Sequence, residues 1–421
     1  MQPLIPLERV IFAISKALDM SYPALAEHQL RVSYLARILG REVGFSGKEL
    51  EALVIAGALH DLALFTSVDK KLALEEDPQT LERHARWGYA LLRGFPYLRR
   101  SAEFILHHHA PWQILKEKDD QMWALGSNIL RLADTLEIRS RELRPLLFYR
   151  SRLLEDLNSL KGSEFAPEVI EALHRAGEKE LFWLRLENFS KEREVIFQTE
   201  TATHLPCDQI EFLTRLFALI IDLKSPFTRI HSAGVAAVTD WLAEVLGFRD
   251  FMRVFLRVAA YLHDLGKLAV PEAILNKPGH LTEEEWAVMK AHPFYTFRIL
   301  EEIPNLEMVN YIASAHHERL DGRGYPAKLS APDLSLGARV LAVADVTTAL
   351  LEDRPYRKGF LPEKARGILG ELSGSALDPE IVSLVVGNME YVVNLIRYVE
   401  EKRLEQLSTL GYWESKSGRG I

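Results

Sequence analysis

The chain has 421 residues, which is enough for two or three domains of typical size. Its formal net charge of −8 gives no general electrostatic footprint for nucleic acid, and 48% hydrophobic with 26% charged residues is a globular rather than a disordered composition. The single cysteine, Cys207, excludes an intramolecular disulfide, and we find no signal peptide and no apolar run of membrane-spanning length. We therefore expect a cytoplasmic protein with no membrane anchor and no nucleic-acid partner.

Apolar residues recur at helical spacing along almost the whole chain, for example between Leu30 and Ile38 and again between Val235 and Val245. Helix-start signals are frequent as well. Thr282 followed by Glu285 is a capping-box pattern, in which each side chain bonds the other residue's backbone. Sustained strand alternation is scarce. These patterns predict an all-α fold.

Histidine and aspartate repeat in two frames with nearly the same spacing. In each frame a histidine precedes a His-Asp dipeptide by 32 positions, and a second histidine precedes a His-His doublet by 24. The first frame consists of His28, His60, Asp61, His84, His108, His109 and Asp134. The second consists of His231, His263, Asp264, His292, His316, His317 and Asp345. The chain is therefore predicted to contain two copies of one helical unit, at about 1–190 and 205–400, with a C-terminal helix end and tail at 401–421.

Imidazole and carboxylate together form a ligand set suited to Fe, Mn, Zn, Co or Ni, and a pair of such ions is a phosphoester-hydrolysis centre. The lack of thiolates argues against a structural zinc site. A single histidine on an apolar helix is more often a core residue than a ligand. Seven residues in the same order and spacing, twice in one chain, favour metal binding over that alternative.

The second copy carries further motifs beside its ligands. His263 to Lys267 reads HDLGK, a Lys-Pro-Gly turn follows at Lys277, and His316-His317-Glu318 precedes a loop containing Gly324-Tyr325-Pro326. Over roughly residues 225–358 this series resembles the HD-GYP domain, a branch of the HD phosphohydrolase superfamily. The resemblance implies two tandem HD-type helical bundle domains, the second of them catalytic.

Several properties follow from that resemblance as expectations. They are phosphodiesterase activity on cyclic-di-GMP giving pGpG or GMP, a role in signalling, and signalling partners of the GGDEF type. The second frame is expected to hold two divalent metals, most commonly iron or manganese. Three-metal members of the family have a glutamate four residues before the first histidine, where this chain has Phe227. We therefore expect two metals rather than three.

Within the second site, Asp264 is the best candidate for a carboxylate that bridges both metals, so that an activated hydroxide attacks phosphorus in line. Lys267 could bind a phosphate oxygen or protonate the leaving group. Tyr325 could stack on guanine or donate to phosphate, although a packed loop aromatic is almost equally plausible. Arg354 and Arg357 could grip phosphate, with surface charge as the alternative.

The first copy keeps its ligands but loses the surrounding motifs. Leu62-Ala63-Leu64 follows its His-Asp pair in place of Leu-Gly-Lys, and no GYP loop follows the doublet at His108. It resembles a degenerate HD domain, for which we favour a regulatory role and count its seven residues as a candidate second metal site. Three interpretations stay open. The first copy is a sensor or dimerisation unit with a vestigial metal site, a unit that binds a nucleotide or oxygen at a di-iron centre and regulates its neighbour, or a second phosphohydrolase with another substrate.

Two alternatives to cyclic-di-GMP hydrolysis stay open for the whole chain. One is a cyclic-dinucleotide receptor with little turnover. The other is a phosphohydrolase for another cyclic nucleotide or dinucleotide, such as cyclic GMP-AMP. Intact ligands together with Lys267 favour an enzyme over a receptor. A homodimer is compatible with either alternative.

Overall fold

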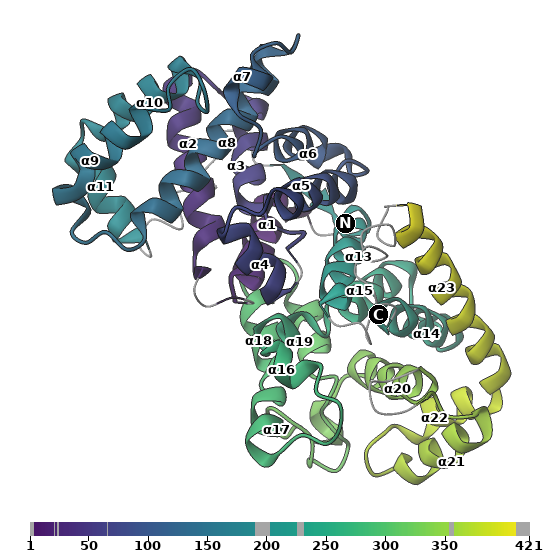
Figure 1. Ribbon diagram of the computed structural model, residues 1–421. Coiled ribbons are helices and arrows are strands. Elements are labelled where there is room, and N and C mark those ends of the chain that lie inside the picture. Colours follow the sequence, from purple (N-terminus) through teal and green to yellow (C-terminus); the bar gives the residue numbers. More distant parts are fainter. Residues whose placement is uncertain are drawn as a thin grey trace. The chain divides into compact units, whose positions relative to one another are not determined.

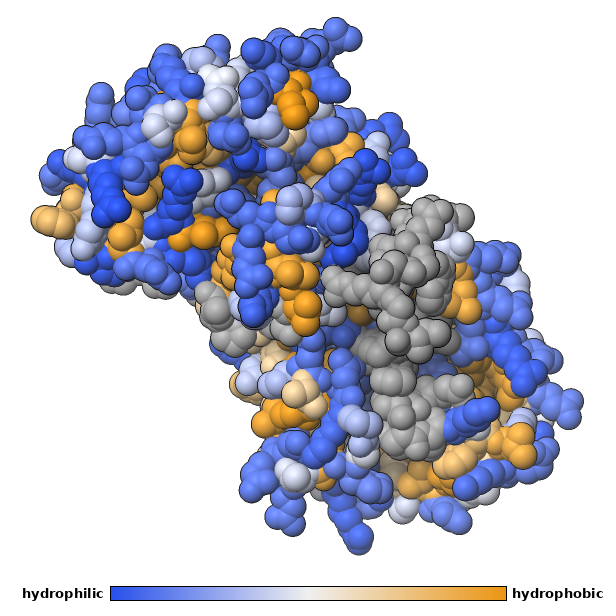
Figure 2. All heavy atoms as spheres, viewed as in Figure 1, coloured by the Kyte–Doolittle hydropathy of each residue, from blue (hydrophilic) through white to orange (hydrophobic). Residues whose placement is uncertain are grey.

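The computed structural model describes residues 4–20, 22, 25–64, 66–189, 203–224, 231–352 and 358–409. Helices dominate, so the all-α prediction is confirmed (Figure 1). The contacts divide the chain into two compact units, one of Leu7–Thr203 and one of Met1–Pro6 with His204–Ile421. No helix of the described residues is both long and apolar enough to cross a membrane. The face drawn in Figure 2 is largely hydrophilic, with apolar residues scattered in small groups.

One short pair of strands lies outside the predicted helical pattern. β1 (Leu4–Pro6) pairs antiparallel with β2 (His204–Pro206), with Ile5 opposite Leu205. The first strand therefore belongs to the later unit rather than to the residues that follow it. Three-residue strands are too short to give a recognisable alternation, and for this reason the sequence did not reveal them.

The unit Leu7–Thr203 is a bundle in which α2 packs against both α3 and α8 (Figure 1). Its α-helices are α1 (Leu7–Met20), α2 (His28–Val43), α3 (Gly47–Leu59), α4 (Ser67–Leu74), α5 (Pro78–Leu92), α6 (Arg99–Leu106), α7 (Trp112–Leu115), α8 (Gln121–Ser140), α9 (Leu146–Asn158), α10 (Pro167–Gly177) and α11 (Glu180–Glu187), with a 3-10 helix, η2, at Pro96–Leu98. Aliphatic side chains from α2, α3 and α8 are fully buried between these helices. This core fixes the helix ends that carry the first frame of histidines.

The later unit repeats this plan, with α14 packed against α15 and α20. Its α-helices are α13 (Cys207–Leu223), α14 (His231–Val245), α15 (Asp250–Leu262), α16 (Glu272–Leu275), α17 (Glu283–Met289), α18 (His292–Leu300), α19 (Glu307–Ser314), α20 (Leu336–Leu351), α21 (Pro362–Leu372), α22 (Pro379–Gly387) and α23 (Met389–Thr409), with 3-10 helices η4 (Leu265–Ala269) and η5 (Ala331–Asp333). The predicted capping box is confirmed at the start of α17, where the Thr282 side chain accepts from Glu285 N and the Glu285 carboxylate accepts from Thr282 N.

Close backbone packing positions η4, which directly follows the His-Asp pair. A Cβ atom on Gly266 would lie 1.9 Å from the carbonyl oxygen of His292 in α18, so only glycine fits there. Gly266 N donates to Thr296 Oγ1, which itself donates to the carbonyl oxygen of His263. The glycine of the HDLGK motif thus lets two ligand-bearing elements approach each other.

Candidate metal centres

The structure brings the seven residues of the second frame together. His231 and His292 begin α14 and α18, and His263 with Asp264 directly follows α15. His316 with His317 comes one residue after the end of α19. Asp345 projects from the middle of α20. Helix ends therefore supply most of the set, which lets side chains from five helices reach one point. Six of the seven are almost fully buried, and His317 is partly exposed.

Asp264 lies between two groups of imidazoles. Its Oδ2 is 3.3 Å from His263 Nε2 and 3.8 Å from His231 Nε2. Its Oδ1 is 3.4 Å from His292 Nε2 and 3.8 Å from His316 Nε2. Each carboxylate oxygen thus faces a different group, as a carboxylate that bridges two ions must.

Asp345 completes the first of these groups, and His317 approaches Asp345 from the other. Asp345 Oδ1 is 3.2 Å from His231 Nε2 and 3.9 Å from His263 Nε2. Asp345 Oδ2 is 4.0 Å from His317 Nδ1. The donor atoms of His292, His316 and His317 form a cluster within 4.8 Å of one another, as do those of His231, His263 and Asp264.

The outer nitrogens of four imidazoles are held by the protein. Nδ1 of His263, His292 and His316 donates to the carbonyl oxygens of Ala260, Met289 and Ala313 at 2.6, 2.8 and 2.7 Å. Nδ1 of His231 donates to Glu352 Oε2 at 2.8 Å. Such anchors fix the tautomer in which Nε2 presents a lone pair to a metal.

These lone pairs face one another in a way that requires a cation. His292 Nε2 lies 3.2 Å from His316 Nε2, and both rings carry their proton on the opposite nitrogen. Buried His263 Nε2 and Asp264 Oδ1 have no hydrogen-bond partner among the described residues. Unsatisfied buried acceptors are costly, and two divalent metal ions, one at each group of imidazoles, would satisfy all of them. The donor set therefore fits a metal pair.

Protonation states agree with that fit. Burial lowers the pKa of His292 to about 3 and that of His317 to about 4, so both imidazoles are neutral at pH 7. Burial alone would raise the pKa of Asp264, but His263 and Lys267 hold it well below its ordinary value. Neutral imidazole and ionised carboxylate are the forms that bind metal ions.

Lys267 and Tyr325 lie at the same centre. Lys267 Nζ is 2.5 Å from Asp264 Oδ2, and its side chain is largely buried. The ring centroid of Tyr325 is 4.8 Å from that of His317, and burial together with the charges of Asp345 and Asp264 raises the pKa of the phenol. The predicted substrate contacts Arg354 and Arg357, and the Phe227 position used to predict two metals, lie outside the described residues.

Three supporting residues escaped the sequence analysis. Glu352, the C-cap of α20, accepts a hydrogen bond from His231. It stands seven positions after Asp345 and so lies on the same helix face, a spacing from which the sequence could have identified it. Glu318 was seen only as part of a motif, yet its carboxylate accepts from Ala327 N at 2.6 Å and Leu329 N at 2.9 Å and so holds the Tyr325 loop. The third is Lys224, which lies beyond α13 and gave no sequence signal.

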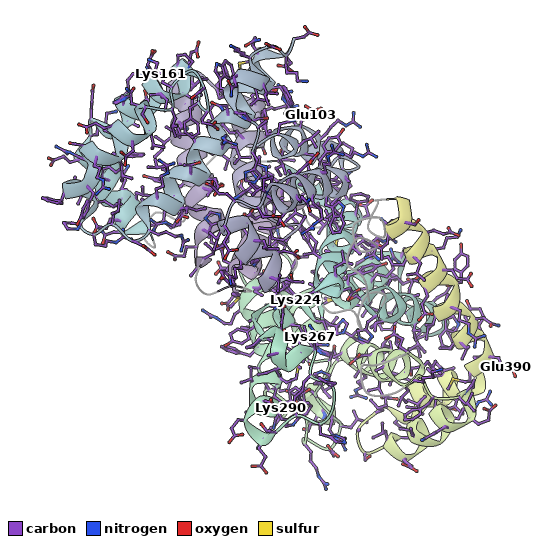
Figure 3. All side chains as sticks on the ribbon, viewed as in Figure 1. Glu103, Lys161, Lys224, Lys267, Lys290 and Glu390 are labelled. Atoms are coloured by element: carbon purple, nitrogen blue, oxygen red, sulfur yellow. The ribbon has the colours of Figure 1, made fainter. Side chains whose placement is uncertain are left out.

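Lys224 holds the 3-10 helix on which Lys267 lies (Figure 3). Lys224 is 4% exposed, and its ammonium donates to the carbonyl oxygens of Lys267, Leu268 and Val270 at 3.3, 2.7 and 2.9 Å. These carbonyls lie at the C-terminal end of η4, where backbone carbonyls run out of partners within the helix, and that of Lys267 also accepts from Val270 N at 3.0 Å. Lys224 is therefore a positioning residue for Lys267.

The first frame converges in the same way within its own unit. Asp61 Oδ2 is 3.4 Å from His60 Nε2 and 3.5 Å from His28 Nε2, whereas Asp61 Oδ1 is 3.4 Å from His84 Nε2. Asp134 Oδ1 lies 3.4 Å from His28 Nε2. The second group consists of His84 and the doublet His108-His109.

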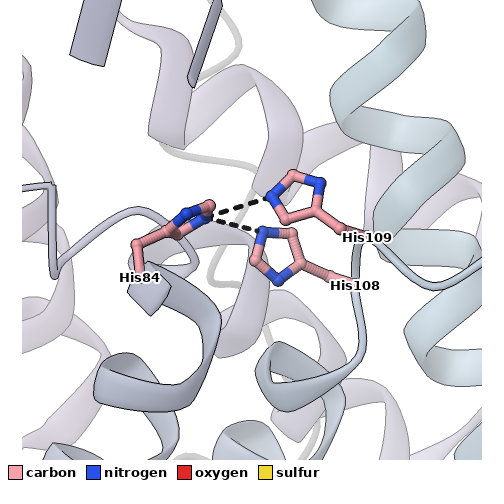
Figure 4. Close-up of side chains that lie close together, drawn as sticks. All are labelled: His84, His108 and His109. Atoms are coloured by element: carbon pink, nitrogen blue, oxygen red, sulfur yellow. Dashed lines mark hydrogen bonds between the residues drawn. The ribbon is translucent and has the colours of Figure 1, made fainter. Parts of the chain in front are cut away.

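Figure 4 shows that doublet with its facing histidine. His84 Nε2 lies 3.3 Å from His108 Nε2 and 3.1 Å from His109 Nε2. Nδ1 of His84 and of His108 donates to the carbonyl oxygens of Thr80 and Ile105. The lone pairs on Nε2 of these two rings therefore face each other, as in the second frame. A bound cation would satisfy both of them here as well.

The two units differ around their ligands. His28 Nδ1 contacts Glu137 Oε2 at 2.7 Å, and Glu137 stands three positions after Asp134, whereas Glu352 stands seven after Asp345. Leu64 takes the place of Lys267 in the HDLGK pattern. The first unit thus keeps a complete ligand set with carboxylate support but has no ammonium at that position.

Comparison with known proteins agrees with this geometry. HD domain models match residues 25–139 and 215–381. The chain is 30% identical over 406 residues to 3'3'-cGAMP-specific phosphodiesterase 1 of Vibrio cholerae, covering 92% of this chain and 93% of that protein. The chain belongs to the HD-GYP family of the HD phosphohydrolases. As a member, it is a metal-dependent phosphodiesterase, and the motif-based prediction of family and enzyme class is confirmed.

Other HD-GYP relatives extend the comparison. A cyclic di-GMP phosphodiesterase of Thermotoga maritima is 33% identical over 237 residues, covering 55% of this chain and 64% of that protein. A crystal structure of a cyclic GMP-AMP specific phosphodiesterase from Vibrio cholerae aligns with a TM-score of 0.64 at 25% identity, covering 92% of this chain and 98% of that one. These relatives are named for cyclic dinucleotides.

Proposed function

We propose that the later unit hydrolyses a phosphodiester of a cyclic dinucleotide at a pair of metal ions held by the second frame. The position of Asp264 carries this proposal, because each of its oxygens faces a separate group of imidazoles. Two such ions would supply a water of lowered pKa and would polarise the phosphoryl oxygens. The donor set suits Fe, Mn, Zn, Co or Ni, and the family resemblance favours iron or manganese among them.

The chain's own residues supply the remaining chemistry. Lys267 Nζ, 2.5 Å from Asp264 Oδ2, is placed to bind a phosphate oxygen beside the bridging carboxylate and to donate its proton to the leaving oxygen. Tyr325 lies over His317 and covers the partly exposed side of the ligand set. The buried imidazoles and carboxylates exclude bulk water from the centre, which strengthens electrostatic interactions there.

The substrate we propose is 3'3'-cyclic GMP-AMP, with cyclic-di-GMP as the second candidate. Relatives that match along nearly the whole chain bear the first substrate in their names, and several that match a shorter part bear the second. Cyclic-di-GMP hydrolysis to pGpG or GMP, GGDEF-type partners and a homodimer stay predictions.

Chromatography of the products tests this function. Wild-type protein loaded anaerobically with iron or manganese is expected to linearise at least one of the two dinucleotides, and Lys267→Met is expected to lower kcat by about 100-fold or more, in the range of lost general acid catalysis. Lys402→Met, an exposed lysine of α23, is the matched control and should retain full activity. Tight binding of dinucleotide by metal-loaded wild type without turnover would leave a receptor instead.

We propose further that the first unit holds its own metal pair and regulates rather than catalyses. The observation that favours metal binding is its complete set of ligands, with His60 Nε2 and Asp134 Oδ1 buried and without a hydrogen-bond partner among the described residues. Leu64 in place of the lysine argues against catalysis. His84→Ala is expected to lower the metal content of the protein by one or two ions per chain without abolishing turnover. Unchanged metal content would contradict the proposal.

A further inference from the structure

Trp286 is a large aromatic side chain that no core explains. It lies on α17, whose seven described residues are all at least partly exposed, and 44% of its own surface is accessible. Single exposed apolar residues are common on proteins and need no special role. Trp286 differs because of where it lies relative to the metal centre.

Tyr325 connects Trp286 to the ligand set. The ring centroid of Trp286 is 6.2 Å from that of Tyr325 at an interplanar angle of 76°, and Tyr325 is 4.8 Å from His317. The loop that carries Tyr325 is fixed from below, since its backbone N donates to the carbonyl oxygen of His317 at 3.2 Å. A Cβ on Gly324 would lie 2.5 Å from Glu318 Cα, so the loop packs directly on the ligand doublet. Tyr325 therefore lies between Trp286 and His317, the partly exposed histidine of the second frame.

A cation accompanies this aromatic surface. Lys290 Nζ lies 5.9 Å from the centroid of the Trp286 ring, within the range of a cation–π contact. Lys290 directly follows α17, and its backbone N donates to the carbonyl oxygen of Trp286 at 2.9 Å. The ammonium and the indole are therefore held together by the same helix end.

An aromatic face with an adjacent ammonium is suited to a purine base. Stacking on aromatic side chains accepts any base, and contributes about 1–3 kcal/mol per base. Guanine presents two adjacent acceptors, N7 and O6, to a lysine, whereas adenine presents one acceptor and a donor amino group. The surface therefore favours guanine over adenine.

We propose that Trp286 and Lys290 form the subsite for one guanine base of the substrate. The inference rests on the proposed hydrolysis of a cyclic dinucleotide, because the base lies one ribose away from a phosphate held at the ligands of the second frame. Tyr325 separates the two regions and lies along the ribose-phosphate path. The subsite accounts for an indole that is exposed beside the centre yet packs into no core.

Three variants test the subsite: Trp286→Ala, Trp286→Phe and Lys290→Met. Trp286→Ala is expected to raise the KM or Kd for cyclic-di-GMP between about 5- and 150-fold, the range of one lost stack, and Trp286→Phe should recover most of it. Lys290→Met should reduce the preference for cyclic-di-GMP over cyclic-di-AMP by about 5-fold or more. Val288→Ala, at an exposed position of the same helix, is the control and should change neither constant.

Inhibition by inorganic phosphate separates a base subsite from support of the metal centre, because phosphate binds the centre and has no base. The inhibition constant for phosphate is expected to be unchanged in Trp286→Ala. An unchanged KM and Kd for the dinucleotide, or an equal loss for dinucleotide and phosphate, would overturn the inference. If wild type binds dinucleotides without turnover, the proposed hydrolysis fails while the Kd comparison still decides the subsite. If metal-loaded wild type neither binds nor cleaves any of them, both fail.

Discussion

Lys224 offers a test of how the scaffold positions Lys267, the lysine we propose to be catalytic. Lys224 is 4% exposed, and its ammonium donates to three backbone carbonyls, two of them at 2.7 and 2.9 Å, at the end of the 3-10 helix that carries Lys267. Lys224→Met keeps the length and most of the volume of the side chain but removes every donor. We expect this variant to fold, to be less stable and to lose activity.

The magnitude follows from the two short bonds. A hydrogen bond to a charged group contributes about 1.5–3 kcal/mol, so losing two of them costs about 3–6 kcal/mol. Methionine also avoids the cost of burying an ammonium group, and this gain reduces the net loss of stability. A net destabilisation of about 2–4 kcal/mol is below the 5–15 kcal/mol stability of a typical domain, so the unit should still fold. A displacement of Lys267 by about 1 Å would lower kcat by about 100-fold.

Urea unfolding and steady-state kinetics measure the two effects. The midpoint for Lys224→Met should fall with an unchanged slope. The kcat should fall much more than KM rises, because we propose that Lys267 acts on the reacting phosphate. Lys402→Met, which removes an exposed ammonium from the same unit, should change neither. A Lys224→Met protein with wild-type kcat would refute the argument that these bonds position Lys267.

Three further results are expected. Gly266→Ala should unfold at lower temperature and lose most of its activity, since its Cβ would lie 1.9 Å from the His292 carbonyl oxygen, and a fully active, equally stable variant would contradict this packing. The pKa of Cys207 is raised to about 12 by burial and by Glu211 and Asp208, so at pH 8 the folded protein should react slowly with a thiol reagent and quantitatively once denatured; equal rates would count against the buried site. Removing metal with a chelator should lower the unfolding temperature, because ions that bind only the folded state stabilise it, and an unchanged temperature would argue against bound metal.

Much of the site could be predicted from local pattern and repetition. The 32- and 24-residue spacings place corresponding histidines at the same points of a repeated bundle. The pattern in each copy therefore strengthened the prediction of ligands in the other. The capping box at Thr282 was predictable because both partners lie within one helical turn. The pairing of β1 with β2 of the later unit could not be predicted, since three residues carry no periodic signal.

The supporting residues depend on distances that the sequence does not encode locally. Glu137 and Glu352 have the same task in the two units, yet they stand at different positions after the helix aspartate, so alignment of the repeats could not pair them. Lys224 acts on residues more than 40 positions away along the chain. Trp286 could be assigned to a site only after Tyr325 was seen between it and His317.

The most direct test compares Asp264 and Asp61, the two aspartates proposed to bridge metal ions, in one set of metal-loaded preparations. Turnover of 3'3'-cyclic GMP-AMP and of cyclic-di-GMP would be measured for wild type, Asp264→Ala and Asp61→Ala, with the metal content of each sample. Asp264→Ala is expected to abolish turnover, and Asp61→Ala to retain it while losing part of the bound metal. Turnover that survives in Asp264→Ala, or that disappears only in Asp61→Ala, would contradict the assignment of catalysis to the later unit.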